Sequence, residues 1–201
     1  MKIRTAILLP YILFAGLTAT SINALAESQI NITTESKPTP NLLVYINPVF
    51  YDHPVHMLHP YLDYWHLRGP MFEKIALKVL NDHHSNAAIC KTDIATNFTL
   101  ALEPYMYYNP QMRVFHSDVI AKVYAGKLEP VATYKAKVQQ QGELNGVAEY
   151  SLEHAYEKAM QNIVMQMQAD SKLVDANNVA PQLGNNMCTL LNTLPTTRKY
   201  F

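Results

Sequence analysis

The clearest hydrophobic pattern in the chain lies between Thr96 and Ala169. Three segments, at 96–107, 112–125 and 130–141, alternate apolar and polar residues with the period of two that is typical of half-buried β-strands. Their short connections favour an antiparallel meander. Apolar residues at three- and four-residue steps then predict an amphipathic helix over 147–169. This block supplies most of the apolar surface that a core would need.

The residues before this block predict three further elements. The run Asn41–Phe50 is almost continuously apolar, which indicates a central strand that Pro48 should end or bend. The pair Gly69 and Pro70 is expected to open a helix that ends near His84, because proline is favoured in a first helical turn. A short strand is expected at 87–90.

This order of elements predicts an α+β fold. We expect a two-layer sandwich with a mainly antiparallel sheet, in the order β-α-β-β-β-β-α, and two helices packed on one face. The single domain should span 41–170. A C-terminal tail, 171–201, is expected to be irregular and to be held to the domain by a disulfide.

The first 26 residues predict export. Lys2 and Arg4 precede an apolar run from Ala6 to Leu17, and a small-residue cleavage site ends at Ala26. The run is too short for a membrane span, so we expect a signal peptide at 1–26 that is cleaved after Ala26. The protein is predicted to reside in the periplasm, with a flexible lead-in at 27–40 and no transmembrane segment after cleavage.

Charge argues against nucleic acid as a partner. The expected signal peptide carries two basic residues and no acidic one, so the remainder has 14 basic and 16 acidic side chains. A nucleic-acid binder would carry a basic excess.

The chain has two cysteines, Cys90 and Cys188. In an oxidising compartment such a pair is most simply a disulfide. A CxxC redox motif is absent, and the spacing does not suggest a two-cysteine metal site. The bridge would close a loop of nearly a hundred residues, for which the chain-entropy model gives at most about 4–5 kcal/mol.

The segment 51–68 holds the candidate chemistry. His53, His56 and His59 have an HxxHxxH spacing, and imidazole is a common ligand of zinc and copper. On a helix each three-residue step falls about 60° short of a full turn, so these rings would converge poorly. Pro54 and Pro60 also interrupt a helix. We therefore favour no metal and no cofactor, and keep zinc or copper as the alternative.

The same segment is rich in aromatic side chains. Tyr61, Tyr64, Trp65 and His66 are the candidate binding residues within it. The simpler interpretation is an aromatic loop that covers an edge of the core.

No catalytic motif supports an enzyme. The chain has no GxSxG, HExxH, glycine-rich phosphate loop or CxxC sequence. A catalytic triad assembled from distant residues is left open.

The order of the predicted elements resembles that of small periplasmic envelope proteins. The elements that carry this resemblance are the Asn41–Phe50 strand, the Pro70–Leu80 helix and, after a meander, the Glu149–Gln168 helix. Such proteins include auxiliary components of ABC transport systems and lipoproteins of the curli-secretion type. The resemblance implies a non-catalytic envelope partner, and it assigns no functional residue here.

Together these features predict an exported accessory protein that binds another envelope component or a second copy of itself. The alternative is a periplasmic protein that binds a metal or a small molecule through the His- and Tyr-rich 51–66 loop.

Overall fold

The computed structural model describes residues 40–83, 86–90, 96–145, 147–173 and 187–194. All of them belong to one compact unit, Lys37–Phe201. The predicted signal peptide, nearly all of the predicted lead-in and most of the predicted tail lie outside the described residues.

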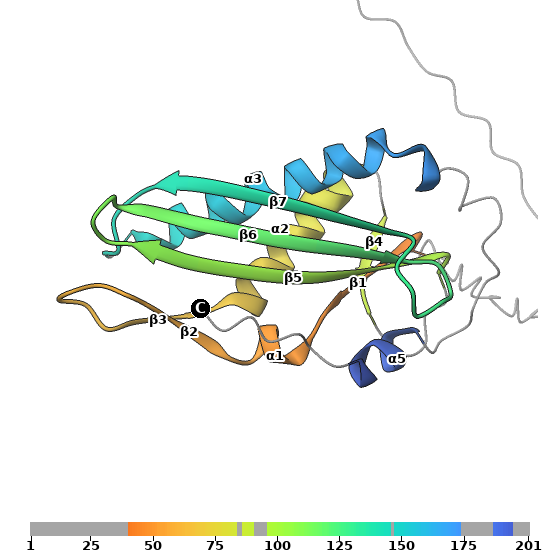
Figure 1. Ribbon diagram of the computed structural model, residues 1–201, viewed down its shortest axis with the longest axis horizontal. Helices are drawn as coiled ribbons and strands as arrows, with labels where there is room; N and C mark the ends of the chain where they lie inside the picture. The colour runs from red at the N-terminus through yellow and green to blue at the C-terminus, as the bar shows by residue number, and fades with distance from the viewer. Residues whose placement is uncertain (1–39, 84–85, 91–95, 146, 174–186, 195–201) are drawn as a thin grey trace, which may run out of the picture. The chain divides into compact units, whose positions relative to one another are not determined.

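A mixed sheet forms the centre of this unit (Figure 1). Its strand order is β4 (Ala87–Ile89), β1 (Leu42–Ile46), β5 (Phe98–Asn109), β6 (Val114–Tyr124) and β7 (Ala132–Gln141). The first strand β1 is parallel to both β4 and β5, whereas β5, β6 and β7 form the predicted antiparallel meander. The α+β fold class is confirmed, with parallel pairing on one side of the sheet.

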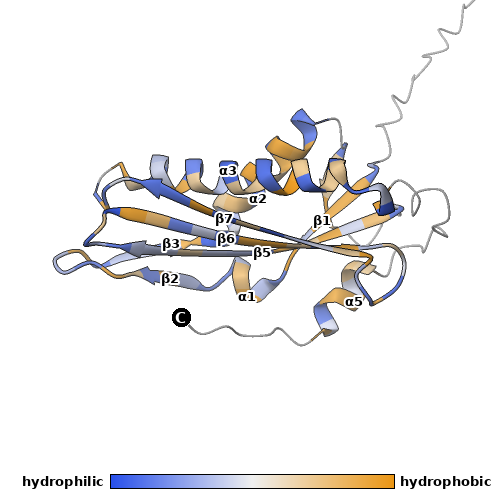
Figure 2. Cartoon of the chain, turned by 45° about the horizontal axis from the view of Figure 1, so that its top comes forward, coloured by the Kyte–Doolittle hydropathy of each residue, from blue (hydrophilic) through white to orange (hydrophobic). Residues whose placement is uncertain are grey.

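Two long helices cover one face of the sheet. They are α2 (Arg68–Asp82) and α3 (Ala148–Ala169), close to their predicted bounds. In Figure 2 the colour of α3 alternates along its turns, as expected for a helix with one buried side. Phe72 of α2 and Tyr156 of α3 are fully buried and make an edge-to-face contact at 5.0 Å between ring centroids. The apolar residues of these two helices and of the sheet face beneath them form the main core.

The apolar run at 41–50 divides into a strand and a helical turn. The Asn47 side chain accepts a hydrogen bond from the Val49 N–H at 2.9 Å, and Pro48 is the first residue of α1 (Pro48–Tyr51). This is the N-cap and first-turn proline pattern, so Pro48 ends the strand as predicted. A Cβ at Gly69 would overlap the Tyr51 backbone, which shows how closely α2 begins against α1.

The aromatic loop predicted before α2 contains two strands that were not predicted. The structure has a hairpin there, in which β2 (Pro54–Met57) pairs antiparallel with β3 (Tyr64–Leu67). Pro54 is the first residue of its strand and Pro60 lies in the connection, two places where the missing N–H costs little. The prolines therefore bound the hairpin and do not prevent it.

Among the described residues, the elements on the opposite face of the sheet are short. In Figure 2 the hairpin, α1 and α5 (Met187–Thr193) lie on the side away from α3. Their contacts form two small apolar clusters, one around Phe50 of α1 and one around Leu191 of α5.

The predicted disulfide joins Cys90, just after β4, to Cys188 in α5. It ties the described part of the tail to the sheet.

Candidate functional site

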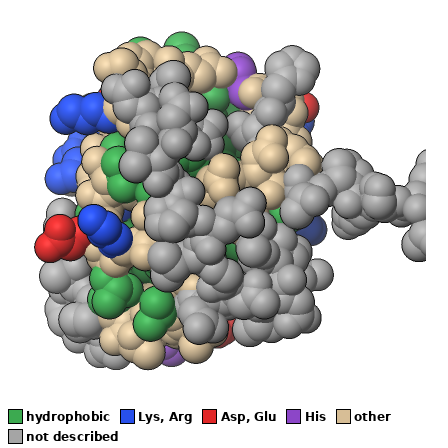
Figure 3. Space-filling model, turned by 90° about the vertical axis from the view of Figure 1, so that its right-hand side faces the viewer, with side chains coloured by type: hydrophobic (Ala, Val, Ile, Leu, Met, Phe, Trp, Pro, Cys, Tyr) green, Lys and Arg blue, Asp and Glu red, His purple; other side chains and the backbone are tan. Residues whose placement is uncertain are grey.

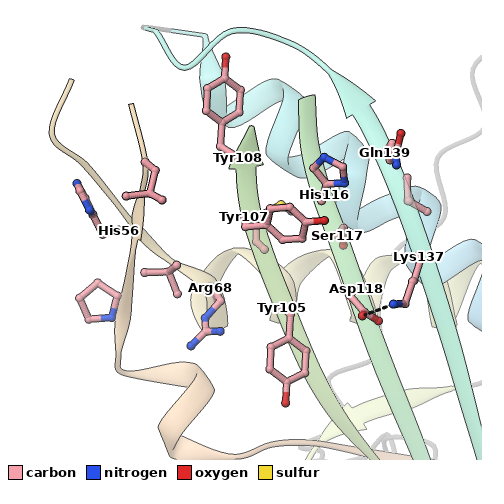
Figure 4. Close-up of a pocket in the computed structure, with 15 residues that line it drawn as sticks. His56, Arg68, Tyr105, Tyr107, Tyr108, His116, Ser117, Asp118, Lys137 and Gln139 are labelled. Atoms are coloured by element: carbon pink, nitrogen blue, oxygen red, sulfur yellow. Dashed lines mark ion pairs between the residues drawn. The ribbon is translucent and has the colours of Figure 1, made fainter. Parts of the chain in front are cut away.

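A groove of about 970 Å³ lies between the β2–β3 hairpin and the face of the meander away from α2 and α3. Figure 4 shows its walls, with the hairpin on one side and β5, β6 and β7 on the other. We call this the hairpin groove. Its lining comprises Pro54, Val55, His56, Leu58, Arg68, Tyr105, Met106, Tyr107, Tyr108, His116, Ser117, Asp118, Lys137, Val138 and Gln139.

Buried polar atoms without partners gather in this groove. Among the described residues, four buried side-chain atoms have no hydrogen-bond partner, namely Arg68 Nε, His116 Nε2, Ser117 Oγ and Asp118 Oδ1. All four belong to residues that line the hairpin groove, although Ser117 lies on the same side of β6 as Phe115 and Val119, which pack in the main core. An unsatisfied buried donor or acceptor costs about 1–3 kcal/mol, so native proteins keep few of them. Their concentration here is typical of a surface that is completed by a ligand.

Arg68 stands at the base of the groove, where α2 begins. Its Nη1 donates to the carbonyl of Pro104 at 3.4 Å, and its guanidinium lies 5.2 Å from the centre of the Phe50 ring. Burial lowers the pKa of this guanidinium, but arginine stays charged in proteins. The described residues show no carboxylate in an ion pair with it. Arg68 is therefore a half-buried cation with hydrogen-bonding capacity left.

Two residues of opposite charge in the groove, Asp118 and Lys137, already neutralise each other. Asp118 Oδ2 lies 3.3 Å from Lys137 Nζ across the β6–β7 ladder. The other oxygen of Asp118 is the one without a partner. The groove therefore combines a compensated pair with the uncompensated Arg68.

Aromatic rings form much of the groove wall. Tyr107 and His116 are directly opposite each other on β5 and β6, and their rings stack at 4.3 Å with an interplanar angle of 5°. Burial lowers the pKa of His116, so its ring is neutral at pH 7. Burial and then the neighbouring Glu103 raise the pKa of Tyr105 to about 12, so that hydroxyl stays protonated. These rings offer flat apolar surface with polar edges.

The structure does not gather the three candidate metal ligands into one cluster. His56 contacts Asp63 at 3.1 Å and packs on Trp65, whereas His59 Nδ1 accepts the Tyr61 N–H and its ring lies near Tyr108. His53 precedes β2. Among the described residues, no group of three or more His, Cys, Asp or Glu side chains could hold a metal ion.

The four candidate binding residues separate into two groups. Tyr61 and Trp65 are 91% and 57% exposed, while Tyr64 packs against the main core. His66 is buried, with Nε2 3.4 Å from the Tyr156 hydroxyl. Burial, and then the nearby Arg68, lower the pKa of His66 to about 4. His66 is thus a buried residue packed on Tyr156, and it does not line the hairpin groove.

Most of the groove residues carried no sequence signal of a site. His116, Ser117 and Asp118 form three consecutive polar residues in a strand whose other residues, except Lys122, are apolar, and this was the available signal. Of the predicted candidates, His56 alone lines the groove.

Elsewhere in the part of the chain that the structure describes, no other buried side-chain polar atom lacks a hydrogen-bond partner. On the side drawn in Figure 3, Lys and Arg side chains lie along one edge and the hydrophobic side chains form small separate groups. Within the described residues, no helix has the length and apolar character to cross a membrane.

Comparisons with known proteins leave the family open. No protein-family model matches the chain, and no curated protein matches it. Similar solved structures include a Xanthomonas campestris protein of the DUF330 family, with 13% identity over 70% of this chain and 88% of that one and a TM-score of 0.46. An uncharacterised protein has 11% identity over 65% and 94% of the two chains, with a TM-score of 0.43.

A third similar structure is a presumed lipoprotein from Caulobacter crescentus. It shows 13% identity over 55% of this chain and 84% of that one, with a TM-score of 0.32. These likenesses are weak, and no function is transferred from them. The expected kinship with ABC-transport and curli-secretion components stays a prediction.

Proposed function

We propose that this chain is an exported, non-catalytic accessory protein that binds another component of the cell envelope in the hairpin groove. The observation that carries the proposal is the set of unpartnered buried polar atoms on Arg68, His116 and Asp118, three residues that line one groove. A bound partner would supply the missing hydrogen bonds and would remove the cost of leaving them unmade.

Two further features support this role. The Cys90–Cys188 disulfide fits an oxidising compartment such as the periplasm. The groove joins aromatic walls to a few polar groups, which is how binding sites combine contact area with specificity.

The test is site-specific photo-cross-linking in intact cells. A photoreactive residue at Gln139 would lie in the groove lining, and one at Lys135 would lie four residues away on the same face of β7, outside it. We expect a reproducible adduct of defined mass from position 139 alone, and its loss in the Arg68→Gln variant. Equal adducts from both positions, or none from position 139, would contradict the proposal.

The alternative is a small-molecule ligand in the same groove. The volume of about 970 Å³ favours it, because ligand pockets commonly measure roughly 300–1,000 Å³. Native mass spectrometry of the protein purified from its own compartment separates the two functions. A bound mass of a few hundred daltons that is lost in Arg68→Gln would support the small molecule over a protein partner.

A further inference from the structure

The strand β5 loses one neighbour halfway along its length. Its first part pairs with β1, from Phe98 opposite Leu42 to Leu102 opposite Ile46. Beyond Leu102, β5 continues to Asn109 and pairs only with β6 among the described strands. We call the unpaired side of 103–109 the free edge of β5. A free edge presents backbone N–H and C=O groups that can template another strand.

The position of Pro104 identifies the groups on this edge. Proline has no N–H, so Pro104 and its partner Val119 cannot exchange the two bonds of a hydrogen-bonded pair. Pairs alternate along an antiparallel ladder, so Tyr105 and Tyr107 make the bonds to β6. The backbone groups of Met106 therefore turn toward the free edge, together with those of Tyr108.

The contact with Arg68 supports the same assignment. Its Nη1 donates to the Pro104 carbonyl from the hairpin side of β5 (Figure 4), which places that carbonyl on the edge away from β6. The carbonyls of residues 104, 106 and 108 share this direction because strand geometry repeats every two residues.

The hairpin groove lies along this edge. Met106 and Tyr108 line it on one side, and Pro54 to His56 of β2 line it on the other. Within the described residues β2 pairs only with β3, so it forms a wall and does not cap the edge of β5 with a ladder. The charge in the groove also points to a particular ligand. Asp118 is paired with Lys137, whereas Arg68 has no carboxylate partner among the described residues.

We propose that the hairpin groove receives an extended segment of a partner protein, which adds a strand to the free edge of β5. The segment would hydrogen-bond to the backbone of Met106 and Tyr108 and place the carboxylate of an acidic side chain on Arg68. Strand addition draws affinity from main-chain hydrogen bonds and specificity from pockets for alternate side chains. A guanidinium matches a carboxylate with two parallel bonds. The inference rests on the proposed function and names the chemistry of the partner.

Amide exchange in the presence of a defined peptide tests the strand addition. The probes are capped hexapeptides of alternating threonine and valine with one glutamate, moved through each position, and the same set with glutamine. With the best glutamate peptide, the amide protons of Met106 and Tyr108 should exchange markedly more slowly, as followed by NMR. The Tyr107 amide, which already bonds to β6, serves as the internal control and should change little.

Variants test the carboxylate contact. Arg68→Gln should lower the affinity for the glutamate peptide about tenfold or more, because hydrogen bonds between charged groups are stronger than those between neutral ones. Binding of the glutamine peptide should stay unchanged. Arg68→Lys should retain part of the glutamate preference, since lysine keeps the positive charge but cannot make the two parallel hydrogen bonds of a guanidinium. Lys135→Gln removes a cation from the same sheet face outside the groove and should leave both affinities intact. Thermal unfolding verifies that each variant is folded.

The outcomes separate this inference from the proposed function. Binding without slower exchange at Met106 and Tyr108 would overturn strand addition, and equal affinity for the glutamate and glutamine peptides would overturn the carboxylate. If no peptide binds while position 139 still gives its specific cross-link, the groove has a partner of another kind and this inference fails alone. Loss of the cross-link as well would overturn both.

Discussion

The two faces of β6 differ in how completely the rest of the described chain covers them. Phe115, Val119 and Ala121 point to the helices and are fully buried in the main core. His116 and Asp118, between them in sequence, point to the hairpin groove and keep unpartnered polar atoms. Apart from Ser117, the helix-covered face of the strand is closed by apolar packing, whereas the groove face keeps unpartnered polar atoms on two adjacent positions of that face.

The difference follows from the length of the elements that cover each face. The helices α2 and α3 have 15 and 22 residues, whereas α1 and α5 have 4 and 7. A short helix can bury only a small cluster, such as Tyr105 and Ile120 around Phe50. The sheet surface between those clusters remains available. Incomplete cover, and not a catalytic motif, is what marks the groove as the place for a partner.

The largest effect should come from breaking the helix-covered face. Phe72→Ala removes a fully buried ring against Tyr156 and should lower the free energy of unfolding by about 3–5 kcal/mol. Urea denaturation measures this loss. Tyr150→Ala truncates an exposed ring on α3 and should change stability by no more than ~0.5 kcal/mol. A similar loss in both variants would contradict the assignment of the core.

A pH-dependent loss of stability should also come from the helix-covered face. The pKa of His66 is about 4 in the folded protein and about 6.5 when unfolded, so between these values the unfolded state binds the proton. The stabilisation is complete above pH 6.5 and is lost as the pH falls toward 4, by roughly 3 kcal/mol.

Urea denaturation at several pH values in this range measures the slope of the free energy of unfolding against pH. His66→Gln should flatten it, because glutamine does not titrate. His154→Gln, at a partly exposed position of α3, is the comparison variant. An unchanged slope in His66→Gln would show that other groups control the acid sensitivity.

The smallest effect on stability is expected at the groove. Tyr107 is 49% exposed and stacks on His116 as a cross-strand pair, a contact worth about 0.2–1 kcal/mol. Tyr107→Ala should therefore cost less than about 1 kcal/mol. It should also raise the pKa of His116 toward its ordinary value by restoring water to the ring, as an NMR titration would show. A loss comparable to that of Phe72→Ala would mean that the groove wall belongs to the core.

Much of the fold was predictable because its signals are local. The meander, both long helices and the short strand before Cys90 appear within a few residues of their predicted bounds. Periods of two and of three to four residues arise from the geometry of each element itself. The Cys90–Cys188 pairing was predictable for a different reason, since two cysteines allow one bridge within a chain.

The candidate site was less predictable because its residues acquire their roles from distant contacts. His66 belongs to the histidine-rich segment that suggested a ligand site, yet it packs on Tyr156, ninety residues away in sequence. Arg68 is the first residue of an ordinary helix, and only the approach of Pro104 and Phe50 makes it a half-buried cation.

The sequence by itself determined the α+β class, the order of the elements and the apolar face of each long helix. These depend on the spacing of residues along one strand or one turn. Only the tertiary structure decided that 54–57 pairs with 64–67, that this hairpin lies along the free edge of β5, and that the unpartnered atoms of Arg68 and His116 share one groove. Those relations join residues tens of positions apart, and strand register and packing across such distances are properties of the assembled fold, which local periodicity does not encode.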